Sequence, residues 1–180
     1  MKALASLAAD ARQSPLLDTA KEALSARGYR YSDLNERGAS FIVRTDHASY
    51  RVTLKADEER QHLYVSCRYD WVVDAERRPA VAEVLCRLNE RFSLGNFDLT
   101  FATGEVGFRR GVDVSGGTLT GRMADHMVSG ASYAMELCEL AILEVARGES
   151  DPATAVQPLF EGSNESRAHL TISLAERAPE

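Results

Sequence analysis

The sequence predicts an α+β domain, in which one antiparallel sheet of about five strands has helices on one face. Apolar residues alternate with polar ones over five segments, which is the period of half-buried strands. In three other segments they recur at the spacing of an amphipathic helix. The order along the chain is helix, three strands, helix, two strands, helix. Runs of antiparallel strands separated by helices favour a helical layer that covers one sheet face.

The first helix is expected over residues 15–27. Ser14 is a suitable N-cap, and Pro15 is favourable at the first helical position. Gly28 can end the helix. Its apolar stripe consists of Leu17, Ala20 and Leu24. Residues 1–13 are expected to form an N-terminal arm.

Three antiparallel strands should follow the first helix. Apolar and polar residues alternate over 40–45, then over 50–55, and again over 63–69. The polar segment 56–60 connects the last two of these strands, and we expect its carboxylates to be solvated.

A second helix and a hairpin are expected next. Pro79 can open a helix over 79–92, in which apolar residues recur at i, i+3/i+4, i+7 and i+11. Alternation then resumes over 97–101 and over 106–114, on either side of a turn at Thr103 and Gly104. Two alternating runs around a glycine turn predict a hairpin.

A long helix should complete the domain. A link rich in Gly and Thr, residues 115–121, precedes it, and Gly148 is a suitable end. The apolar stripe consists of Met123, Met127, Ala131, Ala134, Cys138, Ala141 and Val145. The opposite side carries Asp125, Ser129, Ser132, Glu136 and Glu139.

The domain is therefore expected to span residues 14–148. The remaining residues, 149–180, contain Pro152, Pro158 and Gly162 and show no sustained period apart from a short strand at LTISL. We expect this segment to be a flexible C-terminal tail.

Composition excludes several classes of protein. The chain has 180 residues, a net charge of -6 and a pI near 5.3, which disfavours binding to nucleic acid or to anionic lipid. It contains no apolar run long enough for a membrane helix and no apolar leader, so we expect a cytoplasmic protein. Three cysteines without close pairing indicate reduced thiols rather than a disulfide framework.

The residues that most often carry chemistry are scattered. His47, His62, His126 and His169 fall in four different predicted segments, without the paired spacing of a metal site. No nucleophile motif is present, and the Gly-rich segment 111–122 lacks the spacing of a phosphate loop. We therefore expect no catalytic residues, no metal and no cofactor, and a function other than that of an enzyme.

The sheet face opposite the helices is a candidate surface for a partner. If Val52, Val65, Leu99 and Phe108 face the helices, the alternation places Arg44, Arg51, Lys55, Tyr64, Arg68 and Arg109 on the other face, together with Thr53, Ser66, Asp98 and Thr100. One interpretation is ordinary polar alternation on a solvated face. The other is a locally basic docking face for an acidic polypeptide segment.

Self-association is a second candidate role. Cys86 lies on the opposite side of its helix from Leu85 and Leu88, and three residues broaden the apolar stripe of the long helix: Tyr133, Leu137 and Leu140. Core packing explains such residues, and so does a contact between two copies of the chain. A homodimer is therefore expected, and Cys86, Tyr133, Leu137 and Leu140 are its candidate contacts.

One run of residues resembles a known family. The segment RLNERFSLGNFDLTFATGEVGFRR, residues 87–110, resembles the central signature of YbjN-type proteins, and upstream segments are in the right order over residues 16–148. The matching positions are Asn89, Gly95, Asn96, Phe97, Gly104, Phe108 and Arg109. Gly107 departs from the pattern, because the family tends to have a larger or charged residue there.

The resemblance implies a fold similar to that of type III secretion chaperones, which are usually homodimeric and bind extended client segments without chemistry. It implies a non-catalytic binding or regulatory protein, and it supplies no active site. The motif residues also have structural interpretations: Asn89 can cap a helix, and Gly95, Asn96 and Gly104 can supply turns. An alternative function is a small-molecule sensor with an apolar pocket near Met123, Met127 and Phe108.

Overall fold

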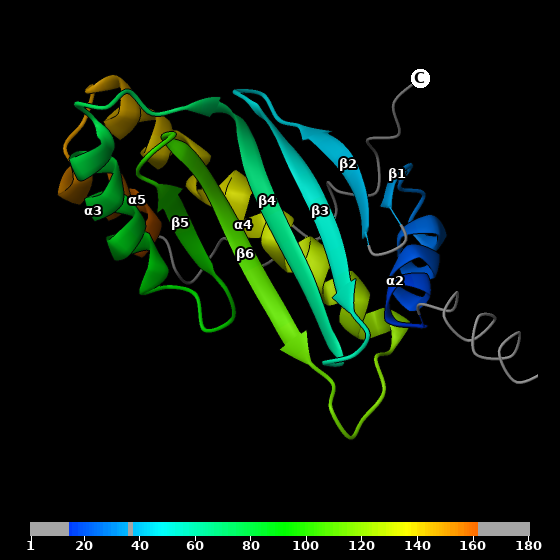
Figure 1. The fold of residues 1–180 in the computed structure, drawn as a ribbon. Coiled ribbons are helices and arrows are strands. Elements are labelled where there is room, and N and C mark those ends of the chain that lie inside the picture. Colours follow the sequence, from blue (N-terminus) through cyan, green and yellow to red (C-terminus); the bar gives the residue numbers. More distant parts are fainter. Residues whose placement is uncertain (1–14, 36–37, 162–180) are drawn as a thin grey trace, which may run out of the picture.

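The computed structural model describes residues 15–35 and 38–161 and shows two layers, a sheet and a set of helices (Figure 1). The sheet has six strands in the order β1-β2-β3-β4-β6-β5, and every neighbouring pair is antiparallel. The predicted α+β class with an antiparallel sheet is therefore confirmed, with one strand more than expected.

The strands are β1 (Ser32–Asn35), β2 (Gly38–Arg44), β3 (Ser49–Asp57), β4 (His62–Val72), β5 (Asn96–Thr100) and β6 (Glu105–Asp113). Strand β1 was not predicted, because its sequence, SDLN, has no alternation and all four residues are exposed. It pairs with β2 at the edge of the sheet. Phe101 was expected in the fifth strand but lies in the turn after it, 57% exposed.

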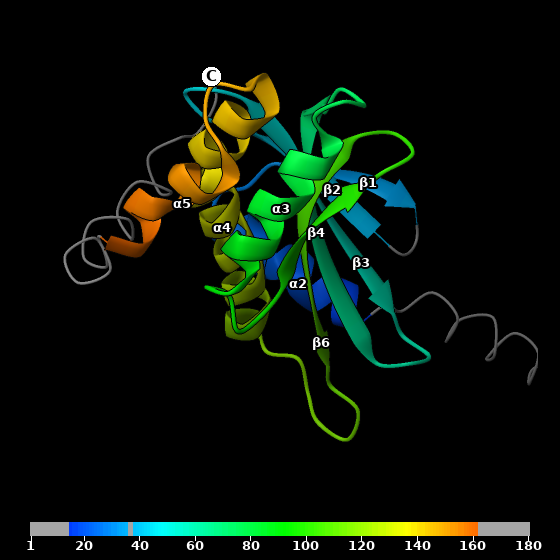
Figure 2. The same cartoon turned by 90° about the vertical axis from the view of Figure 1, so that its left-hand side faces the viewer.

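The helices in the described part of the chain are α2 (Pro15–Ala26), α3 (Arg78–Asn89), α4 (Gly121–Arg147) and α5 (Pro152–Glu161). Helix α4 packs on β4 and β6, α2 packs on β3 and α4, and α3 packs on β5 and α4. Figure 2 shows the helices on one side of the sheet, while no described residue covers the other side. The expected helical layer on one face is thus present.

No helix in 15–35 and 38–161 combines the length and apolarity needed to cross a bilayer.

The long helix begins and ends where the sequence indicates. The side chain of Thr120 accepts a hydrogen bond from the backbone N–H of Met123, which is an N-cap. Gly148 adopts a φ of 74° at the C-cap, and the adjoining N–H groups reach the carbonyls of Glu144 and Val145. This left-handed cap explains why the helix stops at glycine.

The N-terminus of α2 is capped from a distant loop. The backbone N–H groups of Leu16 and Leu17 donate to Oε1 of Glu58, at 3.1 and 3.4 Å. Ser14, the expected cap, lies outside the described residues. Glu58 was expected to be a solvated loop residue, but a carboxylate at a helix N-terminus satisfies unpaired N–H groups and the positive end of the helix dipole. The β3–β4 loop therefore holds α2 against the sheet.

The signature segment joins α3 to the β5–β6 hairpin. Asn89 does not cap α3; its side-chain amide pairs with the backbone of Phe97, donating to the carbonyl at 3.2 Å and accepting from the N–H at 2.7 Å. Phe92, Phe97 and Phe108 pack edge to face, with ring centroids 5.0 to 5.8 Å apart. Gly95, with a φ of 95°, leaves no room for a side chain beside the Phe108 ring. These contacts explain the residue types of the signature by packing.

Two residues on the expected polar side of α4 are buried. Ser132 is 1% exposed and Glu139 is 3% exposed, because α4 is embedded between the sheet and neighbouring helices. Glu139 accepts a hydrogen bond of 2.7 Å from the hydroxyl of Thr45, in the loop after β2. Burial raises the pKa of the Glu139 carboxyl, and the hydrogen bond from Thr45 opposes that shift.

An arginine also lies on the helix side of the sheet. Arg110 pairs with Val65 of β4, on the same side as Phe108, and its guanidinium donates to the carbonyl of His126 at 3.1 Å. Gly130 of α4 gives it space, because a Cβ there would lie 2.1 Å from a guanidinium nitrogen. Desolvation lowers the pKa of Arg110. The arginine therefore helps to seat α4 on β6.

The segment after Gly148 was expected to be a flexible tail, but its first part forms helix α5. Asp151 caps this helix by accepting from the N–H groups of Ala153 and Thr154, at 3.0 and 3.1 Å. Ala155 and Val156 are buried against α3 and α4. Helix α5 has only ten residues and contains Pro158, so its apolar residues show little helical periodicity in the sequence. The expected N-terminal arm and the LTISL strand lie outside the described residues.

Replacing the buried carboxylate should change how stability depends on pH. Because the pKa of Glu139 is raised in the folded chain, the wild type binds more protons when folded and loses stability as the pH rises above the ordinary glutamate pKa. Glu139→Gln removes this loss and keeps an acceptor for Thr45. The stability of the variant relative to wild type should increase from about pH 4 to about pH 7 in urea unfolding.

The control for this measurement is Glu90→Gln, at the exposed end of α3. Its difference from wild type should stay constant over the same pH range. A constant difference for Glu139→Gln as well would contradict the assigned effect of burial.

Candidate functional site

The candidate site is the sheet face that no described residue covers, which we call the open face. The strand register places all six predicted partner residues on it. Arg51 of β3 lies opposite Arg68 of β4, Lys55 lies opposite Tyr64, and Ser66 lies opposite Arg109 of β6. Ile42 of β2 lies opposite Arg51 and is therefore also on the open face. Arg44 is two residues further along β2, so its side chain lies on the same face. The predicted grouping of these residues on one face is therefore present.

The buried side of the same strands agrees with the alternation. Val52, Val65 and Phe108 are at most 1% exposed, and Leu99 packs against the core. These four residues therefore face the helices, as the predicted assignment of the two sheet faces requires. Because side chains alternate along a strand, their burial fixes which residues reach the open face.

The open face is mixed in charge rather than basic. The same register brings acidic residues to it from four strands: Asp57, Asp70, Asp98, Glu105 and Asp113. The expectation of a locally basic face is corrected in this respect. Asp98 was already expected on this face, and the alternation also indicated the other four, because each of them is an even number of residues from a predicted basic residue of its strand.

The best-defined contact on the open face crosses three strands. The guanidinium of Arg68 in β4 makes two parallel hydrogen bonds with Asp98 in β5, at 2.8 and 2.9 Å. Arg109 approaches the same carboxylate at 3.7 Å. The Arg68 side chain is 34% exposed and that of Asp98 is 20% exposed, so the pair is partly shielded from water. Two parallel hydrogen bonds between a guanidinium and a carboxylate are stronger than a single ion contact.

Gly107 makes this contact possible. It lies in β6 between Arg68 and Asp98 in the register, and a Cβ there would be 2.1 Å from the carbonyl oxygen of Cys67 and 2.7 Å from the Arg68 side chain. The arginine therefore lies flat across β6. Gly107, the residue that departs from the family pattern, therefore provides the space in which Arg68 crosses β6 to reach Asp98.

A second glycine positions the aromatic residue of the face. Tyr64 lies opposite Gly111, and a Cβ at that glycine would be 3.1 Å from the tyrosine ring. The Tyr64 hydroxyl is 2.7 Å from Nδ1 of His62, and the two rings meet edge to face. The ring is thus oriented by its neighbours while 44% of the residue stays exposed.

A row of short side chains crosses the middle of the open face. The register aligns Ser40, Thr53 and Ser66 over three strands and continues to Arg109 of β6 and Asn96 of β5. Ser40 is only 3% exposed, so the accessible part of the row begins at Thr53. The rows on either side carry longer side chains, with Ile42, Arg51 and Arg68 in one, and Lys55 and Tyr64 in the other. Arg51 and Lys55 are exposed and make no ion pair with any residue in the described ranges. Their charges are therefore available to a partner.

The candidate dimer contacts occupy two helices. Tyr133 and Leu140 of α4 are 36% and 51% exposed, and Leu137 between them is partly buried against the core. Their spacing places the three on one side of the helix. Cys86 is exposed on α3, on the same side as Glu83 and Glu90. The three α4 residues thus form one stripe, and Cys86 lies on another helix.

Of the three residues expected near an apolar pocket, Met127 and Phe108 are packed in the core and Met123 is exposed. Met127 and Phe108 are 5% and 1% exposed, while Met123 is 37% exposed at the start of α4. The described part of the chain holds no group of three His, Cys, Asp or Glu side chains placed to bind a metal. His47, His62 and His126 lie on separate elements, and His169 lies outside the described residues.

Comparison with protein families gives one clear match. The YbjN family model, described as "Putative bacterial sensory transduction regulator", matches residues 17–142. The match includes the signature segment 87–110 and every strand of the sheet. No curated protein sequence matches the chain.

Two solved structures are similar to this one. The crystal structure of YbjN from E. coli has 12% sequence identity and a TM-score of 0.54, over 73% of this chain and 92% of that chain. The crystal structure of the ExsC–ExsE complex has 18% identity and a TM-score of 0.44, over 64% of this chain and 90% of the matching one. The likeness to YbjN supports a shared fold.

Adding a methyl group at Gly107 should destabilise the chain. In Gly107→Ala the Cβ overlaps the backbone of β4 and displaces Arg68 from Asp98. We expect a loss of about 2 kcal/mol or more in the free energy of unfolding, measured by urea denaturation. Gly117→Ala is the matched control, because its Cβ would meet only an ordinary contact at 3.6 Å. Equal stabilities for the two variants would show that β6 can move away from β4 at little cost.

Proposed function

The chain belongs to the YbjN family, and we propose that it is a non-catalytic regulatory or chaperone-like module that binds a polypeptide segment, as a homodimer in the cytoplasm. The observation that carries the proposal is the open face, which spans the sheet and combines exposed apolar groups with charges of both signs. A surface of this kind suits reversible recognition of another chain.

The open face offers anchors on both sides of its row of short side chains. Ile42 and Tyr64 are each 44% exposed and supply apolar contact area. Arg51 and Lys55 can orient an acidic segment, because neither is engaged by a described carboxylate. An extended segment laid along Thr53 and Ser66 would meet these four side chains.

Arg68 and Arg109 have a different role in this proposal. Both approach Asp98, so a partner carboxylate would have to compete with a bond that already exists. Their main effect is to hold β4, β6 and β5 in register at the edge of the surface. Binding specificity would therefore depend more on Arg51 and Lys55 than on the complete basic set.

Dimerisation is proposed through the outer side of α4. Tyr133, Leu137 and Leu140 form an apolar stripe that no described helix covers completely. Pairing two such stripes would bury the same residues on both copies, as a two-fold contact does. This would leave the open faces of both copies accessible, because α4 lies on the other side of the sheet.

The partner-binding proposal can be tested by charge reversal. Affinity purification of the full chain from its native cell, followed by mass spectrometry, should recover a polypeptide partner with wild type. Arg51→Glu combined with Lys55→Glu should reduce recovery at least tenfold, about 1.4 kcal/mol, because both charges orient the acidic segment. Arg122→Glu, on an exposed arginine of α4, is the control and should recover the partner normally. Equal recovery by all three proteins would reject the open face as the binding surface.

The dimer proposal predicts twice the chain mass of 19.8 kDa in light scattering. Leu140→Asp should convert the protein to monomer, because it places a charge in the centre of an apolar contact. Leu94→Asp changes a leucine that is 68% exposed between α3 and β5, and this variant should remain dimeric. A wild-type mass of one chain at micromolar concentration contradicts the proposal.

A further inference from the structure

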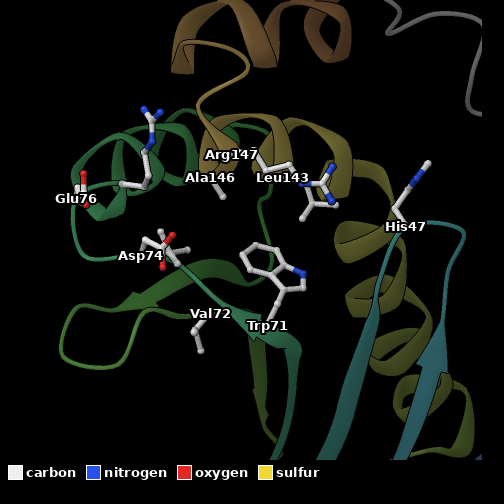
Figure 3. A pocket seen from close by; sticks show the side chains of 10 residues that line it. His47, Trp71, Val72, Asp74, Glu76, Leu143, Ala146 and Arg147 are labelled. Carbon is white, nitrogen blue, oxygen red and sulfur yellow. The ribbon is translucent and has the colours of Figure 1, made fainter.

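A pocket of about 450 Å³ lies on the helix side of the molecule, away from the open face. It forms where the end of β4, the segment leading into α3 and the C-terminal end of α4 meet (Figure 3). Its lining combines apolar and charged side chains: Trp71, Val72, Leu143 and Ala146, with His47, Asp74, Glu76, Arg77 and Arg147. The volume lies within the range that small-molecule sites occupy.

Trp71 lies in the middle of this pocket with a polar atom that has no partner. Its ring stacks on Tyr69, at 4.9 Å between centroids and 18° between planes. The indole nitrogen Nε1 is shielded from solvent and has no hydrogen-bond acceptor among the described residues. Buried indole N–H groups usually have a partner, so this one calls for an acceptor that the described chain does not provide.

The charges around the pocket are arranged in two groups. Figure 3 shows Arg147 and His47 on the side toward which the Trp71 nitrogen points, and Asp74 and Glu76 on the opposite side. None of these side chains makes an ion pair with a described residue. Arg77 is held elsewhere, because a Cβ at Gly148 would lie 1.7 Å from its guanidinium, which places it against the end of α4.

We infer that the pocket binds a small zwitterion with an apolar side chain, such as a free amino acid or a dipeptide. The ligand carboxylate accepts from Nε1 of Trp71 and pairs with the guanidinium of Arg147. The ammonium group lies toward Asp74 and Glu76, and the apolar side chain packs on Leu143 and Ala146. A simple cation would leave the buried indole N–H without an acceptor, whereas a zwitterion supplies the acceptor and also places its ammonium group beside the exposed carboxylates of Asp74 and Glu76.

Entry of the ligand requires a movement that the structure permits. Because Nε1 is shielded from solvent, a ligand carboxylate can reach it only if a neighbouring side chain moves. Arg147 is exposed and makes no ion pair in the described ranges, so no bond has to break. This inference goes beyond polypeptide binding and does not depend on it, because the pocket and the open face lie on opposite sides of the sheet.

The experiment uses the tryptophan itself. Trp71 is the only tryptophan of the chain, so tryptophan-selective fluorescence of the full-length protein reports on this pocket alone. L-leucine and L-leucyl-L-leucine are the probes. Leucinamide, which lacks the carboxylate, and N-acetyl-leucine, which lacks the ammonium group, are the matched controls. We expect a saturable change in emission with at least one zwitterion, and binding at least tenfold weaker for both controls.

Two variants assign the contact. Arg147→Gln should weaken binding of the zwitterion at least about tenfold, because it removes the charge-assisted bond. Arg122→Gln, at the other end of α4, should bind like wild type. Calorimetry on Trp71→Phe, which has no fluorescent reporter, should show the same weakening as Arg147→Gln. A response to only one of the two probes supports the pocket and identifies the source of the carboxylate as a free amino acid or a short peptide.

Three results would overturn the inference. The first is the absence of both a saturable emission change and a binding heat with either probe at millimolar concentration. The second is equal binding of leucinamide, and the third is unchanged binding by Arg147→Gln. The double variant Arg51→Glu and Lys55→Glu should bind the zwitterion normally, so failure of the open-face proposal and failure of this one are distinguishable.

Discussion

The structure depends on a single constraint, the antiparallel register of β3, β4 and β6 under a helical layer that covers only one face. Tyr50, Val52 and Leu54 of β3 are each fully buried, and the residues between them are not. Because the side-chain period of a strand is two, a slip of one residue would exchange the core with the open face. The apolar core and the arrangement of the open face are therefore fixed by the same pairing.

The family signature is explained by this constraint rather than by chemistry. Strand β5 lies at the edge of the sheet, so its outer side has no neighbouring strand. There the side-chain amide of Asn89 makes hydrogen bonds with the backbone of Phe97. Gly95 and Gly104 adopt positive φ values of 95° and 83°, and at both positions a Cβ would overlap a neighbouring strand or ring. Glycine is required where the backbone takes this conformation and neighbours approach closely. The signature thus closes α3 and the hairpin onto the sheet, and the surfaces for partners lie outside it.

The sequence predicted the elements in which a pattern of apolar residues repeats. It did not predict contacts between single residues that are far apart in the chain. Alternation predicted β2 to β6 and placed the six candidate partner residues on the open face, although the acidic residues that make this face mixed in charge were largely overlooked. Helical spacing with Gly148 predicted α4. Strand β1 and helix α5 are short, and their apolar residues do not recur at the spacing of a strand or a helix. Their formation therefore depends on tertiary contacts. The contact of Glu58 with α2 and the pairing of Arg68 with Asp98 join residues 42 and 30 positions apart, which no local pattern reveals. Trp71 could be noticed only as the single tryptophan, because its unpaired nitrogen is a property of the pocket.

The two surfaces are close along the chain although they lie on opposite faces, because both include residues of β4. Arg68 and Asp70 point to the open face, while Tyr69 and Trp71 point to the helices. Between Arg68 and Val72 the register of β4 against β6 shifts, so the strand is irregular where the two surfaces meet. Such irregularities redirect side chains and often lie beside functional sites. A ligand at Trp71 would change binding at Arg51 and Lys55 only if it favoured one of two arrangements of this segment, since coupling between sites requires differential affinity for two states. The irregular end of β4 is the place in the described chain where such a difference would be transmitted with the fewest intervening residues.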